Sequence, residues 1–164
     1  MKRVIVIGCP ASGKSTFSRK LAEATGLPLV HLDTVYFKPD GSPIEREDFD
    51  RRLGEILSGE SWIIDGNYQR TLARRLATCD TVFLFDLPTE VCLEGARARV
   101  GVPRSDLPWT EKELAPEFEW AIGEFHGKKL PEIYALLEGF GGEKVIFTSR
   151  EQADRYIFDL RGGE

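Results

Sequence analysis

Residues 4–15 read Val-Ile-Val-Ile-Gly-Cys-Pro-Ala-Ser-Gly-Lys-Ser. The first four form a short β-branched run, which is typical of a strand buried on both faces inside a parallel sheet. The next eight, Gly8–Ser15, match the pattern GxxxxGK[ST] of the Walker A phosphate-binding loop at every fixed position. Phe17, Leu21 and Ala22 follow at helical spacing, so the motif lies between a predicted strand and a helix predicted over about 14–25.

Each fixed position of this phosphate loop has a physical reason. Glycines allow a positive φ and the close approach of an anion to backbone N–H groups, and the helix that follows adds its positive end. Lys14 is predicted to hold the β and γ phosphates of a nucleoside triphosphate, Ser15 to bind Mg²⁺, and Thr16 to donate to the α phosphate. A glycine-rich turn without a ligand is the alternative. The predicted nucleotide-binding residues are Gly8, Pro10, Ala11, Ser12, Gly13, Lys14, Ser15 and Thr16, and Lys14 is also a predicted catalytic residue.

Four further strand-like runs alternate with helical segments. Strands are predicted over about 27–32, 62–64, 82–85 and 144–147, and helices over about 42–57, 70–77, 89–99, 111–138 (with a break near Gly127 or Pro131) and 150–160. This alternation predicts an α/β fold in three layers, α/β/α, with a five-stranded parallel sheet. The 164 residues fit one domain, 1–164, with a short lid inserted at about 100–112. Ligands of such sheets bind at the carboxyl ends of the strands.

Two aspartates are expected at those strand ends. Asp33 follows the second predicted strand and is a candidate to orient or deprotonate a substrate hydroxyl. Asp65 follows Trp62-Ile63-Ile64 in a Walker B arrangement, in which the carboxylate reaches Mg²⁺. Gly66, Asn67 and Tyr68 come next and are predicted to contact the phosphate acceptor. For both aspartates the alternative is a capping or turn residue, and for His31 a structural role on the opposite side of the strand is expected.

Arginines gather after these elements, at Arg70, Arg74, Arg75, Arg97, Arg99 and Arg104. Phosphoryl transfer needs fixed cations near the transferred group, so Arg97 and Arg104, which flank the predicted lid, are candidate catalytic residues. Solvated helix-face charges are the alternative for most of the six. Aromatic residues also surround the lid, and they are expected in the core more than as a platform for a nucleobase; they are Trp109, Phe118, Trp120 and Phe125.

The composition limits the other possibilities. A hydrophobic fraction of 41% suffices for a core, and a net charge of −5 argues against tight binding to nucleic acid. Cys9, Cys79 and Cys92 match no zinc or disulfide pattern and are interpreted as reduced thiols. The chain shows no signal peptide and no apolar run of membrane-spanning length, which predicts a cytoplasmic protein, either a monomer or a homodimer.

Further segments carry a family resemblance that spans nearly the whole chain. They are Gly8–Thr16, His31–Asp33 with Tyr36, Phe37 and Pro39, the run Trp62–Tyr68, Arg75-Leu76, Asp86–Pro88, Arg104 with Asp106, Glu117-Phe118 with Trp120, and Ser149. The chain resembles the nucleoside-monophosphate-kinase-like group of P-loop NTPases. Within that group it is most similar to the adenylate-kinase-related topology modulation protein family.

The resemblance implies an adenylate-kinase-like core that uses ATP and Mg²⁺. It implies an acceptor site near Asp33 and Asp65 that includes Arg75, a lid with arginines, and a loop at Ser149 and Arg150 beside the adenine. Adenylate kinases carry Asp-Gly-Phe-Pro-Arg after the third strand, whereas this chain has Asn67 and Tyr68 in place of Phe and Pro. That departure argues against AMP as the acceptor.

The sequence therefore favours an ATP-dependent phosphotransferase that acts on a small molecule, nucleotide-like or another metabolite. Two alternatives stay open. One is an ATP-binding regulator without an acceptor, and the other is a nucleic-acid-associated NTPase, which the acidic balance disfavours.

Overall fold

The computed structural model describes residues 1–163. Its centre is a five-stranded sheet in which every pairing is parallel, with the order β2-β3-β1-β4-β5. The strands are β1 (Arg3–Gly8), β2 (Leu29–His31), β3 (Trp62–Asp65), β4 (Thr81–Phe85) and β5 (Glu143–Phe147). The predicted α/β fold class is therefore confirmed.

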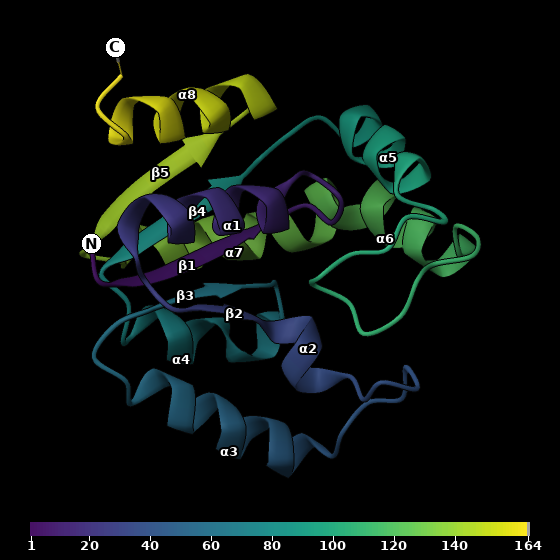
Figure 1. The fold of residues 1–164 in the computed structure, drawn as a ribbon, viewed down its shortest axis with the longest axis horizontal. Helices are drawn as coiled ribbons and strands as arrows, with labels where there is room; N and C mark the ends of the chain where they lie inside the picture. The colour runs from purple at the N-terminus through teal and green to yellow at the C-terminus, as the bar shows by residue number, and fades with distance from the viewer. Residues whose placement is uncertain (164) are drawn as a thin grey trace.

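Helices cover both faces of the sheet. Helix α1 (Lys14–Thr25) crosses in front of β1 in Figure 1, and α7 (Leu130–Glu138) lies behind it. The remaining helical elements are α2 (Leu32–Tyr36), α3 (Arg46–Leu57), the 3₁₀ turn η1 (Gln69–Thr71), α4 (Leu72–Leu76), α5 (Thr89–Ala98), α6 (Pro116–Glu124), the π-helical turn η2 (Phe125–Lys129) and α8 (Arg150–Leu160). Among the described residues, no helix combines the length and the apolar character needed to cross a membrane.

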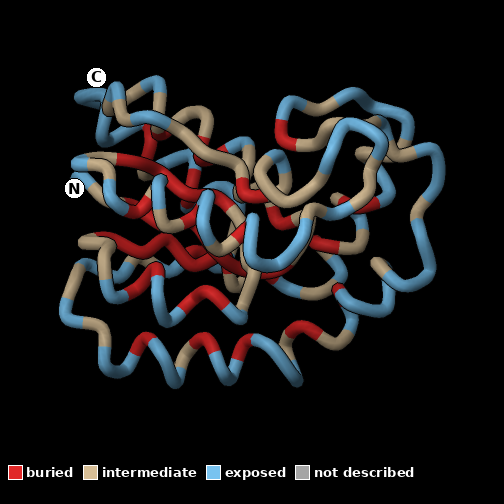
Figure 2. The backbone as a smooth tube through the Cα atoms, turned by 90° about the horizontal axis from the view of Figure 1, so that it is seen from below, coloured by how far each residue is buried: buried red, intermediate tan, exposed pale blue. Residues whose placement is uncertain are grey.

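The core lies along the two inner faces of the sheet, where Figure 2 shows the strands as buried and the outer helix turns as exposed. The four apolar residues of β1, Val4–Ile7, are all fully buried, as a central parallel strand requires. On the face covered by α1 and α8, Phe17 meets Phe83 and Phe85 with ring centroids 4.9 and 5.4 Å apart. This aromatic cluster fixes α1, and therefore the end of the phosphate loop, against the sheet.

Three predicted boundaries differ from the structure. The strand predicted over 27–32 ends at His31, because Leu32 already begins α2, so Asp33 belongs to a first helical turn. The helix predicted from 42 begins at Arg46, because an antiparallel bridge between Phe37 and Pro43 closes the preceding turn. The spacing of apolar residues reveals neither the start of α2 at Leu32 nor the late start of α3 at Arg46.

The long helix predicted over 111–138 is two helices joined by η2. It begins only at Pro116, which occupies the first turn of α6, where a missing N–H is harmless. Pro131 lies in the first turn of α7, directly after the widened turn Phe125–Lys129. A proline inside a continuous helix loses one hydrogen bond and clashes with the preceding turn, which accounts for the break predicted there.

Candidate functional site

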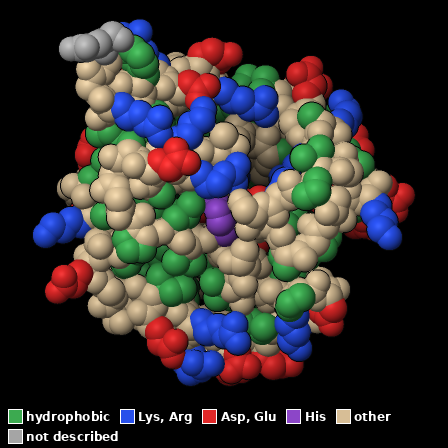
Figure 3. Space-filling view, in the orientation of Figure 1, with side chains coloured by type: hydrophobic (Ala, Val, Ile, Leu, Met, Phe, Trp, Pro, Cys, Tyr) green, Lys and Arg blue, Asp and Glu red, His purple; other side chains and the backbone are tan. Residues whose placement is uncertain are grey.

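A cavity of about 900 Å³ opens at the carboxyl ends of the strands. It is lined by the phosphate loop and the start of α1, by β2 and α2, by residues 65–68, by the 99–115 connection between α5 and α6, and by the start of α8. In Figure 3 it is the hollow in which a histidine is visible, with Lys and Arg side chains gathered on one flank. The position of the cavity is the one predicted from the alternation of strands and helices.

The phosphate loop leaves the sheet through a turn that only glycine can make. Gly8 has a φ of +137°, and a Cβ there would overlap the carbonyl oxygen of Phe85 in β4. The Lys14 ammonium lies over the loop and donates to the carbonyls of Gly8 and Cys9, at 3.0 and 2.7 Å. Burial lowers the pKa of Lys14, although Asp65 opposes that shift. Lys14 therefore carries a poorly hydrated ammonium at the floor of the cavity.

Not every residue of the motif faces the cavity. Pro10, Ala11, Gly13, Lys14, Ser15 and Thr16 line it. Ser12 is fully buried, and its hydroxyl donates to the Cys9 carbonyl at 2.6 Å, so this side chain closes the loop on itself. Gly8 likewise lies behind the lining and shapes the turn. The Ser12 side chain and the Gly8 backbone therefore form hydrogen bonds within the protein, and neither residue lines the cavity.

The phosphate loop is also held from outside. Arg150, at the start of α8, donates to the carbonyls of Ser12 at 3.3 Å and Ala11 at 3.1 Å. Gly95 of α5 packs against the same turn, and a Cβ at that position would overlap the Ala11 carbonyl oxygen. Ala11 itself has a φ of +59°, which is unusual for a residue with a side chain. The loop is thus clamped between α5 and α8.

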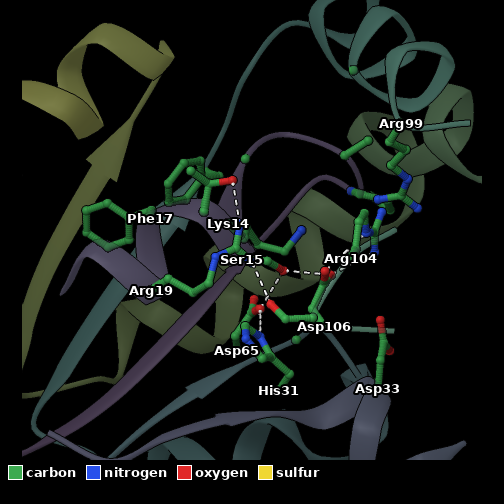
Figure 4. A pocket seen from close by; sticks show the side chains of 18 of the residues that line it. Lys14, Ser15, Phe17, Arg19, His31, Asp33, Asp65, Arg99, Arg104 and Asp106 are labelled. Carbon is green, nitrogen blue, oxygen red and sulfur yellow. Dashed lines mark hydrogen bonds and ion pairs between the residues drawn. The ribbon is translucent and has the colours of Figure 1, made fainter. Parts of the chain in front are cut away.

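Oxygen atoms converge where a metal ion is expected. The Ser15 hydroxyl lies 2.7 Å from Oδ2 of Asp65 and 3.0 Å from Oδ2 of Asp106 (Figure 4). Among residues 1–163 no group of three or more His, Cys, Asp or Glu side chains has the arrangement of a metal site. Mg²⁺ typically takes one or two carboxylates, waters and substrate phosphates. Ser15 and Asp65 therefore fit a magnesium ion that is bound together with a nucleotide.

His31 differs from its predicted role. Its Nδ1 lies 2.7 Å from Oδ2 of Asp65, and the side chain lines the cavity. Strand alternation predicted that His31 would point away from the site, and this was wrong because the chain turns into α2 directly after it. His31 therefore orients the Asp65 carboxylate.

Asp33 opens into the same cavity from the first turn of α2. The Tyr68 hydroxyl donates to its Oδ1 at 2.6 Å. Burial raises the pKa of Asp33, while the hydrogen bond from Tyr68 works against that rise. A carboxylate with a raised pKa beside a phosphate-binding loop has the properties of a general base.

Segment 66–68 is fastened to the phosphate loop by one side chain. The Asn67 amide accepts from the Gly8 N–H at 2.9 Å and donates to the Gly8 carbonyl at 2.7 Å. Both hydrogen-bonding groups of the amide are therefore used within the protein, although Asn67, Gly66 and Tyr68 all line the cavity. The predicted contact of Asn67 with an acceptor stays a prediction, because the amide keeps one further N–H and one further lone pair.

Arg75 lies beneath segment 66–68 and does not line the cavity. It is fully buried, and its guanidinium donates to the backbone carbonyls of Gly66, at 2.8 Å, and of Asn67. Burial lowers its pKa to about 10. The expected contact of Arg75 with the acceptor is thus corrected to a supporting role, because its guanidinium donates to backbone carbonyls on the underside of segment 66–68.

The 99–115 connection covers the phosphate loop with ion pairs. Arg104 forms two hydrogen bonds with Asp106, at 3.1 and 2.7 Å, and Arg99 lies 2.9 Å from Glu111. Although burial opposes ionisation, Arg104 and Ser15 keep the pKa of Asp106 below its ordinary value. Arg104, Asp106 and Arg99 line the cavity.

Two predicted site residues lie elsewhere. Arg97 is about half exposed, pairs with Glu119 of α6 at 3.4 Å, and is absent from the cavity lining, because the helix turns it away from Arg99. Ser149 caps α8 by accepting from the Gln152 N–H and does not line the cavity either, whereas Arg150 does. Residues that are two apart on a helix, or adjacent at its end, face different directions, and the sequence pattern did not specify which of them faces the cavity.

The aromatic residues near the connection divide between several roles. Phe125 is buried in the core, and Trp120 is exposed. Trp109 packs against Phe37 with ring centroids 5.0 Å apart. Phe118 lies under the Arg99 guanidinium and lines the cavity. The expected core role holds for Phe125 and in part for Phe118, which packs against the core as well as lining the cavity.

Sequence reasoning gave Asp106 and His31 no role at the site, although both touch the Ser15 and Asp65 pair. A signal was available for Asp106, since an aspartate two residues after Arg104 in a proline-rich segment is a natural ion-pair partner. For His31 the signal was its position two residues before Asp33, but the alternation of side chains along a strand argued for a position outside the site.

The sheet order, with a GxxxxGKS loop after the central strand, defines the fold of the P-loop kinases. Two solved structures share it at a sequence identity that shows the fold alone. Shikimate kinase from Acinetobacter baumannii in complex with shikimate is 16% identical, with a TM-score of 0.62 over 100% of this chain and 95% of that one. A gluconokinase from Sinorhizobium meliloti is 17% identical, with a TM-score of 0.58 over 99% and 90% of the two chains.

Curated relatives match a shorter part. Adenylate kinases of Thermotoga petrophila and Thermotoga maritima are each 27% identical over 88 residues, which is 52% of this chain and 39% of theirs. The match thus spans well under half the length of those relatives. No protein-family model matches the chain.

Proposed function

We propose that this chain is a phosphotransferase that moves the γ-phosphoryl group of Mg-ATP to a hydroxyl group of a small molecule. One observation carries the proposal, which is that Asp33 opens into the same cavity as the phosphate loop and the Ser15–Asp65 pair. A protein that only binds a nucleotide needs no second carboxylate there. The shared fold of shikimate kinase and gluconokinase supports the same class of reaction.

The donor half of the cavity would bind ATP. The backbone N–H groups of the loop, the amino end of α1 and the Lys14 ammonium would hold the β and γ phosphates, with Thr16 at the α phosphate. Ser15 and Asp65 would hold Mg²⁺, which when bound neutralises charge on the two outer phosphates. Arg150 borders the donor half, where its contacts with the Ala11 and Ser12 carbonyls keep the loop in shape.

The acceptor half would place a hydroxyl group beside Asp33. The acceptor oxygen attacks the γ phosphorus, the bond from that phosphorus to the bridging oxygen breaks, and ADP leaves with the electron pair. Asp33 takes the hydroxyl proton. Tyr68 holds the Asp33 carboxylate in place through its hydrogen bond. Gly66 and Tyr68, on the cavity wall, would contact the acceptor directly.

The 99–115 connection would act as the lid. Arg104 and Arg99 line the cavity and Arg97 does not, so these two are the candidate lid arginines, and Arg104 would have to exchange its pairing with Asp106 for the transferred group. Closing such a segment excludes water from the reaction. The narrower relation to the topology modulation protein family and a cytoplasmic location belong to the same proposal.

The test measures ATP consumption against a panel of nucleosides, nucleotides, sugars and other metabolites. At least one acceptor should stimulate turnover, and Lys14→Ala should lower it by roughly 10²-fold or more, because the charge that stabilises the transferred group is lost. Lys112→Ala, at an exposed position of the 99–115 connection, is the matched control and should leave turnover unchanged.

Asp33→Asn separates the two halves of the site. It should lower phosphoryl transfer far more than it lowers ATP affinity, because Asp33 acts on the acceptor. Equal losses in both would remove its role as the base. A flat response to the whole panel, with ATP still bound, would instead favour a nucleotide-dependent regulator.

A further inference from the structure

The cavity is divided by charge. Arg19, Arg150 and Lys20, which pairs with Asp154 at 2.6 Å, border the phosphate loop, and Arg99 lines the cavity from the 99–115 connection. On the acceptor side, the wall carries the Asp33 and Asp65 carboxylates, the Tyr68 phenol and the His31 imidazole. Figure 4 shows Asp33, Asp65 and His31 on the opposite side of Ser15 from Arg99. This distribution of charge limits the chemical class of the acceptor, and the inference about that class rests on the proposed function.

The arginines nearest the acceptor side are already engaged. Arg75 is fully buried and bonded to backbone carbonyls. Arg70 lies 2.6 Å from Asp50 on the outer surface, and Arg74 donates to the Asp50 carbonyl at 3.1 Å. Among the described residues, none of these three lines the cavity.

Arg104 is the cation of the connection that comes nearest to Asp106 and Ser15, and its charge is compensated. Two hydrogen bonds join it to Asp106, and Glu111 lies 3.6 Å away. Recognition of a phosphate or carboxylate group requires a guanidinium or ammonium that is free to form charged hydrogen bonds. The acceptor side presents no such group among residues 1–163, apart from Lys14, which lies at the phosphate loop.

Hydrogen-bond acceptors, in contrast, are abundant on this wall. Tyr68 occupies one oxygen of Asp33, and within the described chain no donor is paired with Oδ2 of that carboxylate. A carboxylate accepts hydrogen bonds from hydroxyl groups and pairs with ammonium groups, and it repels another anion at close range. The wall therefore suits a donor-rich ligand.

We infer that the phosphate acceptor is a polyhydroxy compound that carries no phosphate or carboxylate group, either uncharged or bearing an amine. The same distribution of charge disfavours nucleoside monophosphates and sugar acids. The acceptor hydroxyl groups would donate to Asp33, and an amine would pair with the same carboxylate.

Matched compounds test this inference directly. Each set shares one carbon skeleton and differs in charge: a sugar acid, the neutral sugar and the amino sugar, and a nucleoside beside its monophosphate. Binding is measured by calorimetry with a non-hydrolysable ATP analogue and Mg²⁺ present, and turnover with ATP. We expect the neutral and amine-bearing members to bind at least tenfold more tightly than the anionic member. The inference is overturned if the anionic member binds equally well or better, or if no neutral or amine-bearing member binds.

A variant without the Asp33 charge tests whether the acceptor side of the cavity sets the preference for acceptors without an anionic group. Asp33→Asn should narrow the difference in affinity between neutral and anionic members, since it removes one repelling charge. Asp159→Asn, which removes an exposed carboxylate of α8 outside the cavity, should leave that difference unchanged. An undiminished difference in Asp33→Asn would contradict the inference.

The two proposals fail in different ways. Tight binding and rapid turnover of an anionic acceptor would overturn the inference about charge and leave the phosphotransferase intact. Loss of the proposed function would instead appear as nucleotide affinity that Lys14→Ala does not change, whatever the acceptor.

Discussion

The phosphate loop with segment 66–68, and the 99–115 connection, face each other across one cavity and are held by different forces. The first pair is fixed by hydrogen bonds to backbone groups, from Asn67 to Gly8 and from Arg150 to Ala11 and Ser12. The connection is held mainly by ion pairs, with Asp106 reaching Ser15 across the gap.

The difference indicates which wall of the cavity is rigid. Backbone carbonyls bonded by a buried guanidinium or amide cannot leave without exposing unsatisfied groups, which costs about 1–3 kcal/mol each. The ion pairs of the connection, in contrast, join side chains within a segment that has no helix or strand, so they do not tie that segment to the rest of the fold. The loop is therefore built to keep its shape, and the connection to rearrange.

The largest effect is expected from Gly95→Ala, which disturbs the packing of α5 against the phosphate loop. The new methyl group would overlap the Ala11 carbonyl oxygen, so α5 or the loop must move. We expect a loss of about 1–3 kcal/mol in the free energy of unfolding, as for other overpacked sites, and weaker ATP binding. Chemical denaturation and calorimetry measure the two.

Gly123→Ala is the matched control for that change. Gly123 lies in α6 with open space around it, so alanine should stabilise the protein by about 0.5–1 kcal/mol through its higher helix propensity. If both variants behaved alike, the close approach of α5 to the loop would be irrelevant.

Asn67→Ala should have the next largest effect. It removes both hydrogen bonds to Gly8, and we expect about 1–2 kcal/mol less stability together with a higher KM for ATP. Asn67→Asp keeps the acceptor for the Gly8 N–H and loses only the donor, so it should fall between wild type and alanine. A urea titration measures this order of stability among the three proteins. An unaltered KM for ATP in Asn67→Ala would show that segment 66–68 does not support the donor site.

Asp106→Asn should act on the connection and hardly on the fold. It weakens the pairing with Arg104 and the contact with Ser15, so we expect a severalfold higher KM for Mg-ATP and a smaller loss of stability than in Asn67→Ala, because the disturbed ion pair lies within the connection. Asp159→Asn, which breaks an exposed pair on α8, controls for the lost charge. A fold as damaged as that of Asn67→Ala would show that the connection is as rigid as the loop.

The smallest effect is a shift in pH dependence. Because burial raises the pKa of Asp33, the base is lost as the pH falls through a value above that of an ordinary aspartate. Tyr68→Phe removes the hydrogen bond that favours the carboxylate, which raises the pKa of Asp33 further. The acidic limb of the kcat/KM profile should move to higher pH, and an unmoved limb would mean that another group is the base.

Features set by a local pattern could be predicted from the sequence, and features set by the packing of separate elements could not. Gly8, Lys14 and the alternation of strands and helices are local patterns with one physical solution, so the fold and the phosphate loop were predictable. The burial of Arg75 under segment 66–68 and the outward direction of Arg97 depend on how separate elements pack. The Ser15–Asp106 contact spans 91 positions of the chain, and no local pattern specifies it.

The central place of β1 has a consequence for the order in which the protein is made. Its two neighbours in the sheet, β3 and β4, end at Asp65 and Phe85, and the loop itself leans on Asn67 and on the Phe85 carbonyl. The phosphate loop therefore gains its full set of contacts only after synthesis has proceeded through β4, well beyond the motif itself.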